Sequence, residues 1–270
     1  MSEGHNEPVI SFEGVRLGFG EGDILRGVSF EVAQGETKVL VGESGSGKTL
    51  TLKLAAGLLK PSAGRVRVLG RNLGAMKETE LLAFRREIGF VFQEGALFDS
   101  LSVAENVAYR LKEDRVDADE IEERVHESLR FVEMEEALDK MPAELSGGMR
   151  RRVSIARALV SRPPVVLYDS PTAGLDPVTA QTIITLILRL RDAQGVTSLL
   201  VTHRLQDAFA LANYRFDAGR ERVMRAESAA SRNGQPATNF LVLRDGGVYF
   251  EGGPASVLES RDEYLKRFLV

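Results

Sequence analysis

A glycine-rich segment at residues 42–49, Gly-Glu-Ser-Gly-Ser-Gly-Lys-Thr, has the residue types needed to bind a chain of phosphates. An apolar, β-branched run at 37–41 precedes it and an apolar-periodic stretch at 50–59 follows, which predicts a strand, a glycine loop and a helix. Consecutive backbone N–H groups and the positive end of the helix would concentrate donors on a β-phosphate. Lys48 would add a charge and Thr49 a hydroxyl for magnesium. The alternative is a plain glycine turn before a helix.

A carboxylate is expected near the same loop. Residues 165–168, Val-Val-Leu-Tyr, are suited to a buried central strand, and Asp169 follows directly. Open parallel sheets bind their ligands at the carboxyl ends of strands, so Asp169 would lie beside the magnesium ion. A surface aspartate that merely ends a strand is the alternative, and the glycine loop upstream argues against it.

A second candidate anion site is the segment Leu145-Ser146-Gly147-Gly148-Met149, which opens the amphipathic run 150–160. A serine and two glycines at a helix N-terminus can bind an anion, yet one phosphate chain needs only one such loop. Taken alone, the segment could equally be a capped helix.

The elements that must position these residues alternate between strands and helices, which predicts a parallel sheet. The middle third reads as helical, with Ile121, Val125, Leu129 and Val132 on one face. Asp245-Gly246, between apolar runs, predicts a β-hairpin. Residues 217–238 are polar with no clear strand and are expected to form an exposed excursion. The tail from 259 to 270 is amphipathic through Leu265, Phe268 and Leu269.

Composition excludes several classes of function. The chain has 270 residues, 43% hydrophobic and 27% charged, which suits an ordinary globular core. It has no cysteine, so disulfides and thiolate zinc sites are excluded, and its net charge of −4 gives no field that would attract nucleic acid. No apolar run reaches the roughly 18 residues of a membrane-spanning helix. The chain is therefore expected to be cytosolic and outside the bilayer, and a nucleic-acid partner is not expected.

These motifs together resemble the ABC transporter ATPase family, from about residue 9 to the C-terminus. The ordered set is the glycine loop, Gln93 after a strand, the Ser146 turn, Asp169, Gly174-Leu175-Asp176, and His203 after the last core strand. The resemblance implies a P-loop NTPase fold of α/β class, with a mainly parallel central sheet, an N-terminal antiparallel β-subdomain and an inserted α-helical subdomain. It implies a single domain at 9–270, with the helical subdomain at about 94–160 and a C-terminal hairpin and tail at 240–270.

The resemblance also implies a location, peripherally attached at the cytoplasmic face of the inner membrane, and roles for individual residues. In that family the Ser146 turn of one subunit closes on ATP held by the other, so a head-to-tail homodimer with two nucleotides and Mg²⁺ is expected. Phe19 would stack on adenine, or else be a core residue; Gln93 would contact magnesium and the attacking water, or else face solvent; His203 would contact the γ-phosphate. The expected metal ligands are Thr49, Gln93 and Asp169. The expected catalytic residues are Ser170, His203, Gln93 and Asp176. The expected nucleotide-binding residues are Phe19, Gly42, Glu43, Ser44, Gly45, Ser46, Gly47, Lys48, Thr49, Leu50, Ser146, Gly147 and Gly148.

Ser170 departs from the family, which normally has a glutamate there to orient or deprotonate the attacking water. A serine hydroxyl is too weakly basic to accept that proton, and loss of a general base typically costs on the order of 10²- to 10⁴-fold in rate. Two interpretations stay open. Ser170 is either a natural substitution that permits slow hydrolysis or an introduced change that holds an ATP-bound dimer closed. A subunit that binds ATP only to assemble a complex is the related alternative.

Met149 is a second departure, because the broader family usually has glutamine there. Ser-Gly-Gly-Met followed by basic residues is similar to the branch that serves MCE-type (Mla) phospholipid transport. The segments 93–98 and 102–107 resemble that branch too, so lipid transport with transmembrane permease subunits, and with accessory lipid-binding or regulatory subunits, is expected. Leu97, Phe98 and Leu101 would either form a docking groove for the permease or belong to the core. A soluble ABC protein acting on DNA or ribosomes is the more distant alternative.

Overall fold

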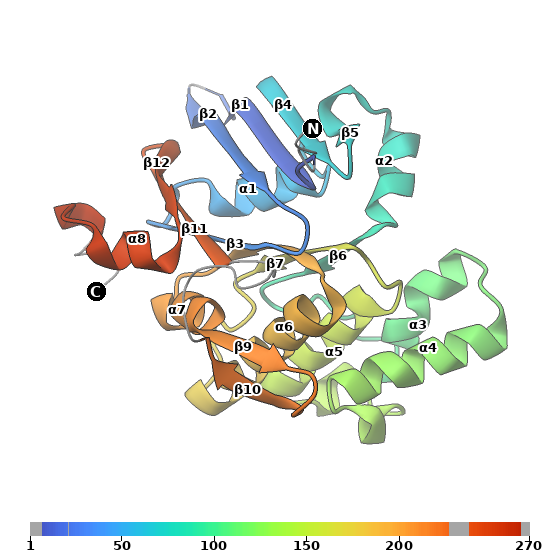
Figure 1. Ribbon diagram of the computed structural model, residues 1–270. Helices are drawn as coiled ribbons and strands as arrows, with labels where there is room; N and C mark the ends of the chain where they lie inside the picture. The colour runs from blue at the N-terminus through green and yellow to red at the C-terminus, as the bar shows by residue number, and fades with distance from the viewer. Residues whose placement is uncertain (1–6, 21, 227–237, 266–270) are drawn as a thin grey trace, which may run out of the picture.

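Two β-sheets organise the chain, which the computed structural model describes at residues 7–20, 22–226 and 238–265 (Figure 1). The larger has six strands in the order β12-β11-β3-β8-β7-β6, and only β12, at one edge, runs antiparallel to its neighbour. Its strands are β3 Thr37–Gly42, β6 Ile88–Val91, β7 Val165–Asp169, β8 Thr197–Val201, β11 Thr238–Arg244 and β12 Gly247–Gly252. The four-stranded antiparallel sheet has the order β2-β1-β4-β5. Its strands are β1 Ile10–Gly18, β2 Asp23–Val32, β4 Ala63–Val68 and β5 Arg71–Asn72.

Helices cover the larger sheet. They are α1 Lys48–Ala55, α2 Glu78–Arg85, α3 Val103–Glu113, α4 Ala118–Phe131, α5 Gly147–Leu159, α6 Pro177–Gln194, α7 Leu205–Asn213 and α8 Pro254–Glu259, with short 3₁₀ turns at Leu73–Ala75, Glu135–Ala137 and Pro142–Glu144. Figure 1 shows the antiparallel sheet on one side of the larger sheet and α3 to α6 on the other. The predicted fold class, with its mainly parallel sheet, antiparallel N-terminal sheet and helical insertion, is confirmed.

The central strands are apolar on both faces because each face meets a separate core. In β3, Val39 and Val41 enter the core shared with the helices, whereas Leu40 enters the core shared with the antiparallel sheet. This alternation follows from the two-residue period of a strand. Strands covered on both faces read as continuous apolar runs, which is why the sequence predicted β3 and β7.

The helical middle third is also confirmed, and its helices begin at defined caps. Ser102 accepts a hydrogen bond from the Glu105 N–H at 3.2 Å, and the Glu105 carboxylate accepts one from the Ser102 N–H at 2.9 Å. This reciprocal pair starts α3. On α4 the predicted positions Val125 and Leu129 are buried, so the apolar face is the one expected.

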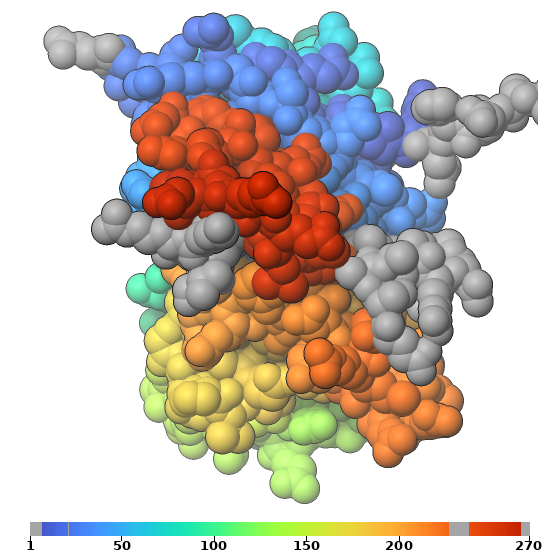
Figure 2. Space-filling view, turned by 60° about the vertical axis from the view of Figure 1, so that its left-hand side comes forward, coloured from blue at the N-terminus to red at the C-terminus, as the bar shows by residue number. Residues whose placement is uncertain are grey.

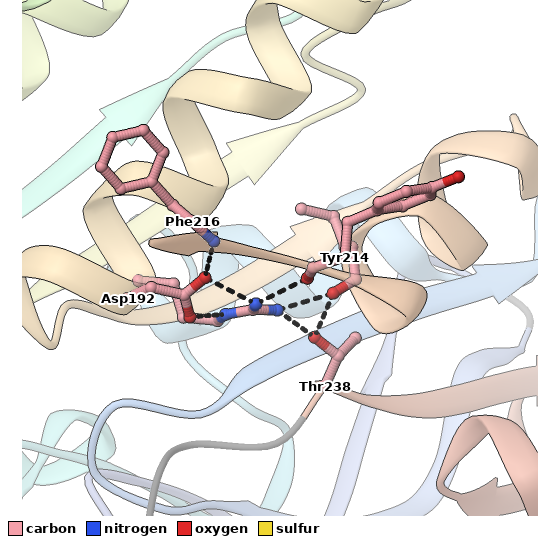
Figure 3. A network of polar contacts seen from close by, with 6 residues as sticks. Asp192, Tyr214, Phe216 and Thr238 are labelled. Atoms are coloured by element: carbon pink, nitrogen blue, oxygen red, sulfur yellow. Dashed lines mark hydrogen bonds and ion pairs between the residues drawn. The ribbon is translucent and has the colours of Figure 1, made fainter. Parts of the chain in front are cut away.

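The expectation of no strand within 217–238 is wrong for its first part. A hairpin of β9 Tyr214–Asp217 and β10 Arg222–Arg225 packs beside α6. Buried Arg191 anchors it by donating to the Leu211 and Tyr214 carbonyls and to Thr238, and the Asp192 carboxylate accepts from the Phe216 N–H at 2.6 Å (Figure 3). The strands are short and mostly polar because one face alone packs on the core. Residues 227–237 lie outside the described residues.

The C-terminal elements β12 and α8 lie alongside both the N-terminal sheet and the helical side of the molecule (Figure 2). Figure 2 shows β12 and α8 between the blue N-terminal sheet and the orange region of α7. The hairpin predicted at Asp245-Gly246 is confirmed as the turn between β11 and β12. In the tail, Leu265 is buried at 3% exposure, whereas Phe268 and Leu269 lie outside the described residues. Across the described ranges, every helix is too short or too polar to cross a membrane.

Candidate nucleotide-binding site

The glycine loop follows β3 directly and curls into α1. Gly42 and Gly47 have φ values of 153° and 97°, in the region that favours glycine. A Cβ at Gly42 would lie 2.4 Å from the Leu243 carbonyl oxygen, and one at Gly47 would lie 2.3 Å from Leu25 Cδ2. A side chain at either position would collide with β11 or β2, so both positions require glycine. Gly47 provides no side-chain cap for α1, so the first amides of that helix are suited to an anion.

Lys48 is held inside this loop. Its Nζ donates to the carbonyl oxygens of Gly42 at 2.8 Å and Glu43 at 2.7 Å, and the residue is 4% exposed. Burial lowers the pKa of Lys48, and the Asp169 carboxylate partly offsets that effect. A desolvated ammonium gains more from an incoming phosphate than an exposed one would, so the loop is organised for a polyanion.

Asp169 and Thr49 meet at the carboxyl ends of the strands, as predicted. Thr49 Oγ1 lies 3.4 Å from Asp169 Oδ1. Burial raises the pKa of Asp169, and the Thr49 hydroxyl and Lys53 act against the rise. A hydroxyl and a carboxylate are the oxygen ligands that Mg²⁺ prefers, and oxygens this close can share a cation bound at about 2.1 Å. The residues present therefore fit a magnesium ion whose remaining ligands are phosphate and water.

His203 lies close enough to the same edge of the sheet to interact with Lys48 and Asp169. Burial lowers the pKa of His203, Lys48 lowers it further, and Asp169 opposes the shift. The imidazole is thus kept neutral near pH 7 and can donate one hydrogen bond. Gln93 is exposed and lies two residues after the end of β6. β6 is the strand next to β7, and its last residue, Val91, pairs with Tyr168. The predicted group of Lys48, Thr49, Asp169 and His203 is therefore brought together, and Gln93 follows the strand that pairs with β7.

Ser170 is buried at 2% exposure, with a left-handed backbone at φ 47°. Its N–H donates to the Val201 carbonyl at 2.9 Å, and its own carbonyl accepts from the Ala173 N–H at 3.0 Å. The position is a fixed corner immediately after the Asp169 carboxylate. What it lacks is a side chain that can accept a proton.

The Ser146 turn begins α5 as a cap. Ser146 Oγ accepts from the Met149 N–H at 3.2 Å, and Ser146 and Gly147 are exposed. A Cβ at Gly148 would lie 2.3 Å from Thr179 Cγ2, whereas one at Gly147 would come no closer than 3.8 Å, to Leu175. Gly148 is thus needed for packing against α6, while Gly147 presents an open backbone. Gly148 therefore packs on α6 of the same chain, while Ser146 and Gly147 stay exposed and available to another molecule.

Asp176 has a structural role that sequence reasoning missed. It caps α6, its Oδ1 accepting from the N–H groups of Val178 and Thr179 at 3.0 Å each, and the Thr179 contacts lower the pKa of Asp176. Arg151 was missed as well. It is 5% exposed and donates to the Phe92 carbonyl at 2.6 Å, next to Gln93. The basic run after the Ser146 turn was the available signal, but only the fold shows which arginine turns inward.

Phe19 is 60% exposed in the loop between β1 and β2, so the alternative that it belongs to the core is wrong. Leu25, near the start of β2, is the side chain that presses on Gly47 of the glycine loop. Leu50, on the first turn of α1, is partly buried against the core beside the antiparallel sheet. An exposed aromatic ring such as that of Phe19 is suited to stacking on a flat base.

The sequence matches one protein family and several known proteins. The family model described as "ABC transporter" matches residues 25–173. The methionine import ATP-binding protein MetN of Bifidobacterium longum is 38% identical over 207 residues, covering 74% of this chain and 52% of that protein. Protein TRIGALACTOSYLDIACYLGLYCEROL 3, chloroplastic, of Arabidopsis thaliana is 40% identical over 220 residues, covering 75% and 63%. The chain thus spans between half and two thirds of these relatives.

Among solved structures, the chain is similar to the ATP-binding cassette MJ0796, in a dimeric, post-hydrolysis state bound to ADP and Pi. The TM-score is 0.74 at 30% sequence identity, and the match covers 90% of this chain and 98% of that one.

Proposed function

Because the chain belongs to the ABC transporter family, we propose that it is the ATP-binding subunit of a membrane transporter and that two copies enclose Mg-ATP between them. One observation carries the proposal. The glycine loop at α1 and the Ser146 turn at α5 each place glycine at a helix N-terminus, but Lys48, Thr49 and Asp169 gather only at the first of these two. The exposed Ser146 turn at the second is explained if it caps the nucleotide held by another copy.

The chemistry assigned to the residues is mainly positioning and electrostatics, as phosphoryl transfer requires. The amides of the glycine loop and Lys48 would hold the phosphates, and Thr49 and Asp169 would hold magnesium, which supplies charge stabilisation when bound. Neutral His203 would donate a hydrogen bond to the γ-phosphate, and Phe19 would stack on the base. Gln93 would orient the attacking water.

ATP hydrolysis coupled to transport is the proposed activity, with slow turnover because Ser170 cannot act as a base. The second candidate is a subunit that binds ATP without hydrolysing it. The residue type at position 170 favours this candidate, because the buried serine side chain after Asp169 has no group basic enough to accept a proton.

The proposed permease contact is a groove of about 340 Å³ beside β6 and the second half of α3. Phe92, Phe98 and Tyr109 line it with exposed aromatic surface, and the Phe98 and Tyr109 rings lie 4.6 Å apart. Charged side chains, among them Arg86, Glu113 and Arg157, line the rest of the groove, and such a mixed lining suits a short amphipathic helix. Leu97, expected with Phe98 in the groove, instead packs partly against the core.

Phospholipid is the proposed cargo, and the cytoplasmic face of the cell membrane is the proposed location. Met149 after the two glycines supports lipid transport, as does a relative whose name contains that of a galactolipid; a relative named for methionine import represents the competing cargo class.

The test is to purify the chain with its membrane partners and reconstitute the complex in phospholipid vesicles. Lys48→Ala serves as the blank for both ATP turnover and phospholipid transfer. Transfer that depends on ATP and on Lys48 supports the proposal. Nucleotide-dependent assembly with turnover equal to the blank would favour the non-hydrolysing subunit. Stimulation by methionine without phospholipid transfer would exclude the lipid assignment.

A further inference from the structure

A polar cluster joins the turn after Ser170 to the residue that follows His203. Asp207, on the first turn of α7, accepts a hydrogen bond from the Thr172 hydroxyl. Thr172 and Asp207 are 1% and 5% exposed, so both are shielded from water. Burial raises the pKa of Asp207, and Thr172 and Arg204 act against the rise. A buried carboxylate that retains its charge must be paired, and Arg204 is the paired cation.

The guanidinium of Arg204 contacts two segments, the first turn of α7 and the turn at residues 172–175. Its Nε lies 3.7 Å from Asp207 Oδ2, while Nη1 donates to the Leu175 carbonyl at 3.2 Å and, more weakly, to the Thr172 carbonyl at 3.4 Å. The backbone of the turn is otherwise closed only by its own bonds, Ala173 N–H to Ser170 and Leu175 N–H to Thr172. Arg204, together with the hydrogen bond from Thr172 to Asp207, therefore links residues 172–175 to the segment that follows β8.

The two ends of this link are both parts of the proposed site. Arg204 directly follows His203, the residue assigned to the γ-phosphate. Leu175 lies next to Gly147, within 3.8 Å of a Cβ built there, and precedes Asp176, which caps α6. Neighbouring residues thus connect His203 through Arg204 and Leu175 to the Ser146 turn, the part of the chain that would meet the other copy's nucleotide.

We propose that Arg204 and Asp207 are positioning residues that hold the Thr172–Asp176 turn in fixed register with His203, so that nucleotide bound by one copy orients the surface offered to the second. The inference rests on the proposed function and deepens it. A planar guanidinium is suited to this role because it contacts two carbonyls and a carboxylate at once, which a lysine ammonium cannot do with the same geometry. Neither residue is assigned a contact with ATP.

The first experiment tests the positioning directly in the chain without nucleotide. In Arg204→Gln, hydrogen exchange of amides within residues 170–176 should become about tenfold faster, because charge-assisted hydrogen bonds that restrain the turn are lost. Arg130→Gln is the matched control. It removes the same charge from an exposed pair with Glu135, far from the cluster in sequence. Exchange in Arg204→Gln equal to that in Arg130→Gln would overturn the proposal.

The second experiment tests the consequence. Mg-ATP affinity of the single chain should stay within about twofold of the unmodified protein, while ATP-driven self-association, followed by sedimentation, should weaken about tenfold, which corresponds to one hydrogen-bonded contact. Arg204→Lys should recover part of the association. A loss of Mg-ATP affinity as large as the loss of association would overturn the positioning role, and so would association equal to that of the unmodified chain.

The two failures are distinguishable. If the unmodified chain with Mg-ATP does not associate at all, the proposed dimer is wrong, and the exchange measurement still decides whether Arg204 positions the turn. If the unmodified chain associates and Arg204→Gln does too, only the positioning inference falls.

Discussion

Ser170→Glu is the substitution that most sharply probes catalysis. Residue 170 follows Asp169 at the carboxyl edge of the sheet, and its backbone is fixed by hydrogen bonds to Val201 and Ala173. Serine and glutamate both carry a Cβ, so the φ of 47° adds little strain that serine does not already bear. The new carboxylate therefore enters a backbone position that is already set.

The expected gain follows from what a positioned base contributes. General-base catalysis is worth about 10²- to 10⁴-fold, and the buried site next to Asp169 raises the pKa of the introduced glutamate through desolvation and like charge. A raised pKa keeps part of the population protonated near neutral pH, so we expect an increase in ATP turnover of about 10- to 100-fold at pH 8. The rate should fall as the pH is lowered through that pKa, because the base must be deprotonated to act.

The assay is phosphate release from Mg-ATP, with Ser170→Gln as the matched control. Glutamine has the same size and no basicity, so its rate should stay at the level of the unmodified chain. Lys48→Ala in the Ser170→Glu background provides the blank. A Ser170→Glu rate no higher than that of Ser170→Gln, with Mg-ATP affinity retained in both, would refute the idea that residue 170 is where the base is missing.

Three further predictions concern packing and charge. Gly148→Ala should lower the free energy of unfolding by about 1–3 kcal/mol in urea titrations, because its Cβ would meet Thr179 Cγ2 at 2.3 Å. The control Gly147→Ala should change that free energy by less than about 0.5 kcal/mol. Adding Thr179→Ser, which removes the Cγ2 atom, should restore the stability of Gly148→Ala. Equal stabilities of the two alanine variants would contradict the packing. Arg191→Met should lower the free energy of unfolding by about 3–5 kcal/mol in the same titrations, because buried Asp192 loses its cation. Mg-ATP affinity should be retained. A decrease of less than about 1 kcal/mol would contradict the anchoring of the β9–β10 hairpin. Because burial lowers the pKa of His203, the unfolded chain binds more protons between the folded pKa and the ordinary histidine value, so stability should rise with pH across that window and His203→Gln should flatten the rise. An unchanged slope in unfolding measured across that window would show that His203 titrates normally.

The parts of the fold that the sequence predicted are those fixed by local pattern. The strand, loop and helix around Lys48 follow from continuous apolar residues, obligatory glycines and a helical period, all of which act within a few residues. Asp169 was placed correctly because the end of a buried parallel strand defines its own location. The hairpin at Asp245-Gly246 is local in the same sense.

What the sequence did not reveal depends on contacts between distant segments. The β9–β10 hairpin is polar by composition, and it is held by Arg191 and Asp192 of α6, whose inward orientation no local pattern indicates. Arg151 and Arg204 look like ordinary surface arginines until the fold brings the Phe92 and Leu175 carbonyls within reach. Asp176 was expected to be catalytic, and its capping contacts became visible only once the start of α6 was known.

The central claim is that nucleotide held by one copy's glycine loop is enclosed by the Ser146 turn of another. Sedimentation with Mg-ATP of Lys48→Ala and Gly147→Glu chains, alone and mixed, tests it most directly. Gly147 is exposed at the first turn of α5, where a glutamate suits the helix but repels phosphate. The account predicts that each variant alone stays monomeric and that the mixture forms a dimer with one nucleotide, capped by the intact turn of the Lys48→Ala chain. A mixture that stays monomeric while the unmodified chain dimerises, or either variant dimerising alone, would contradict it.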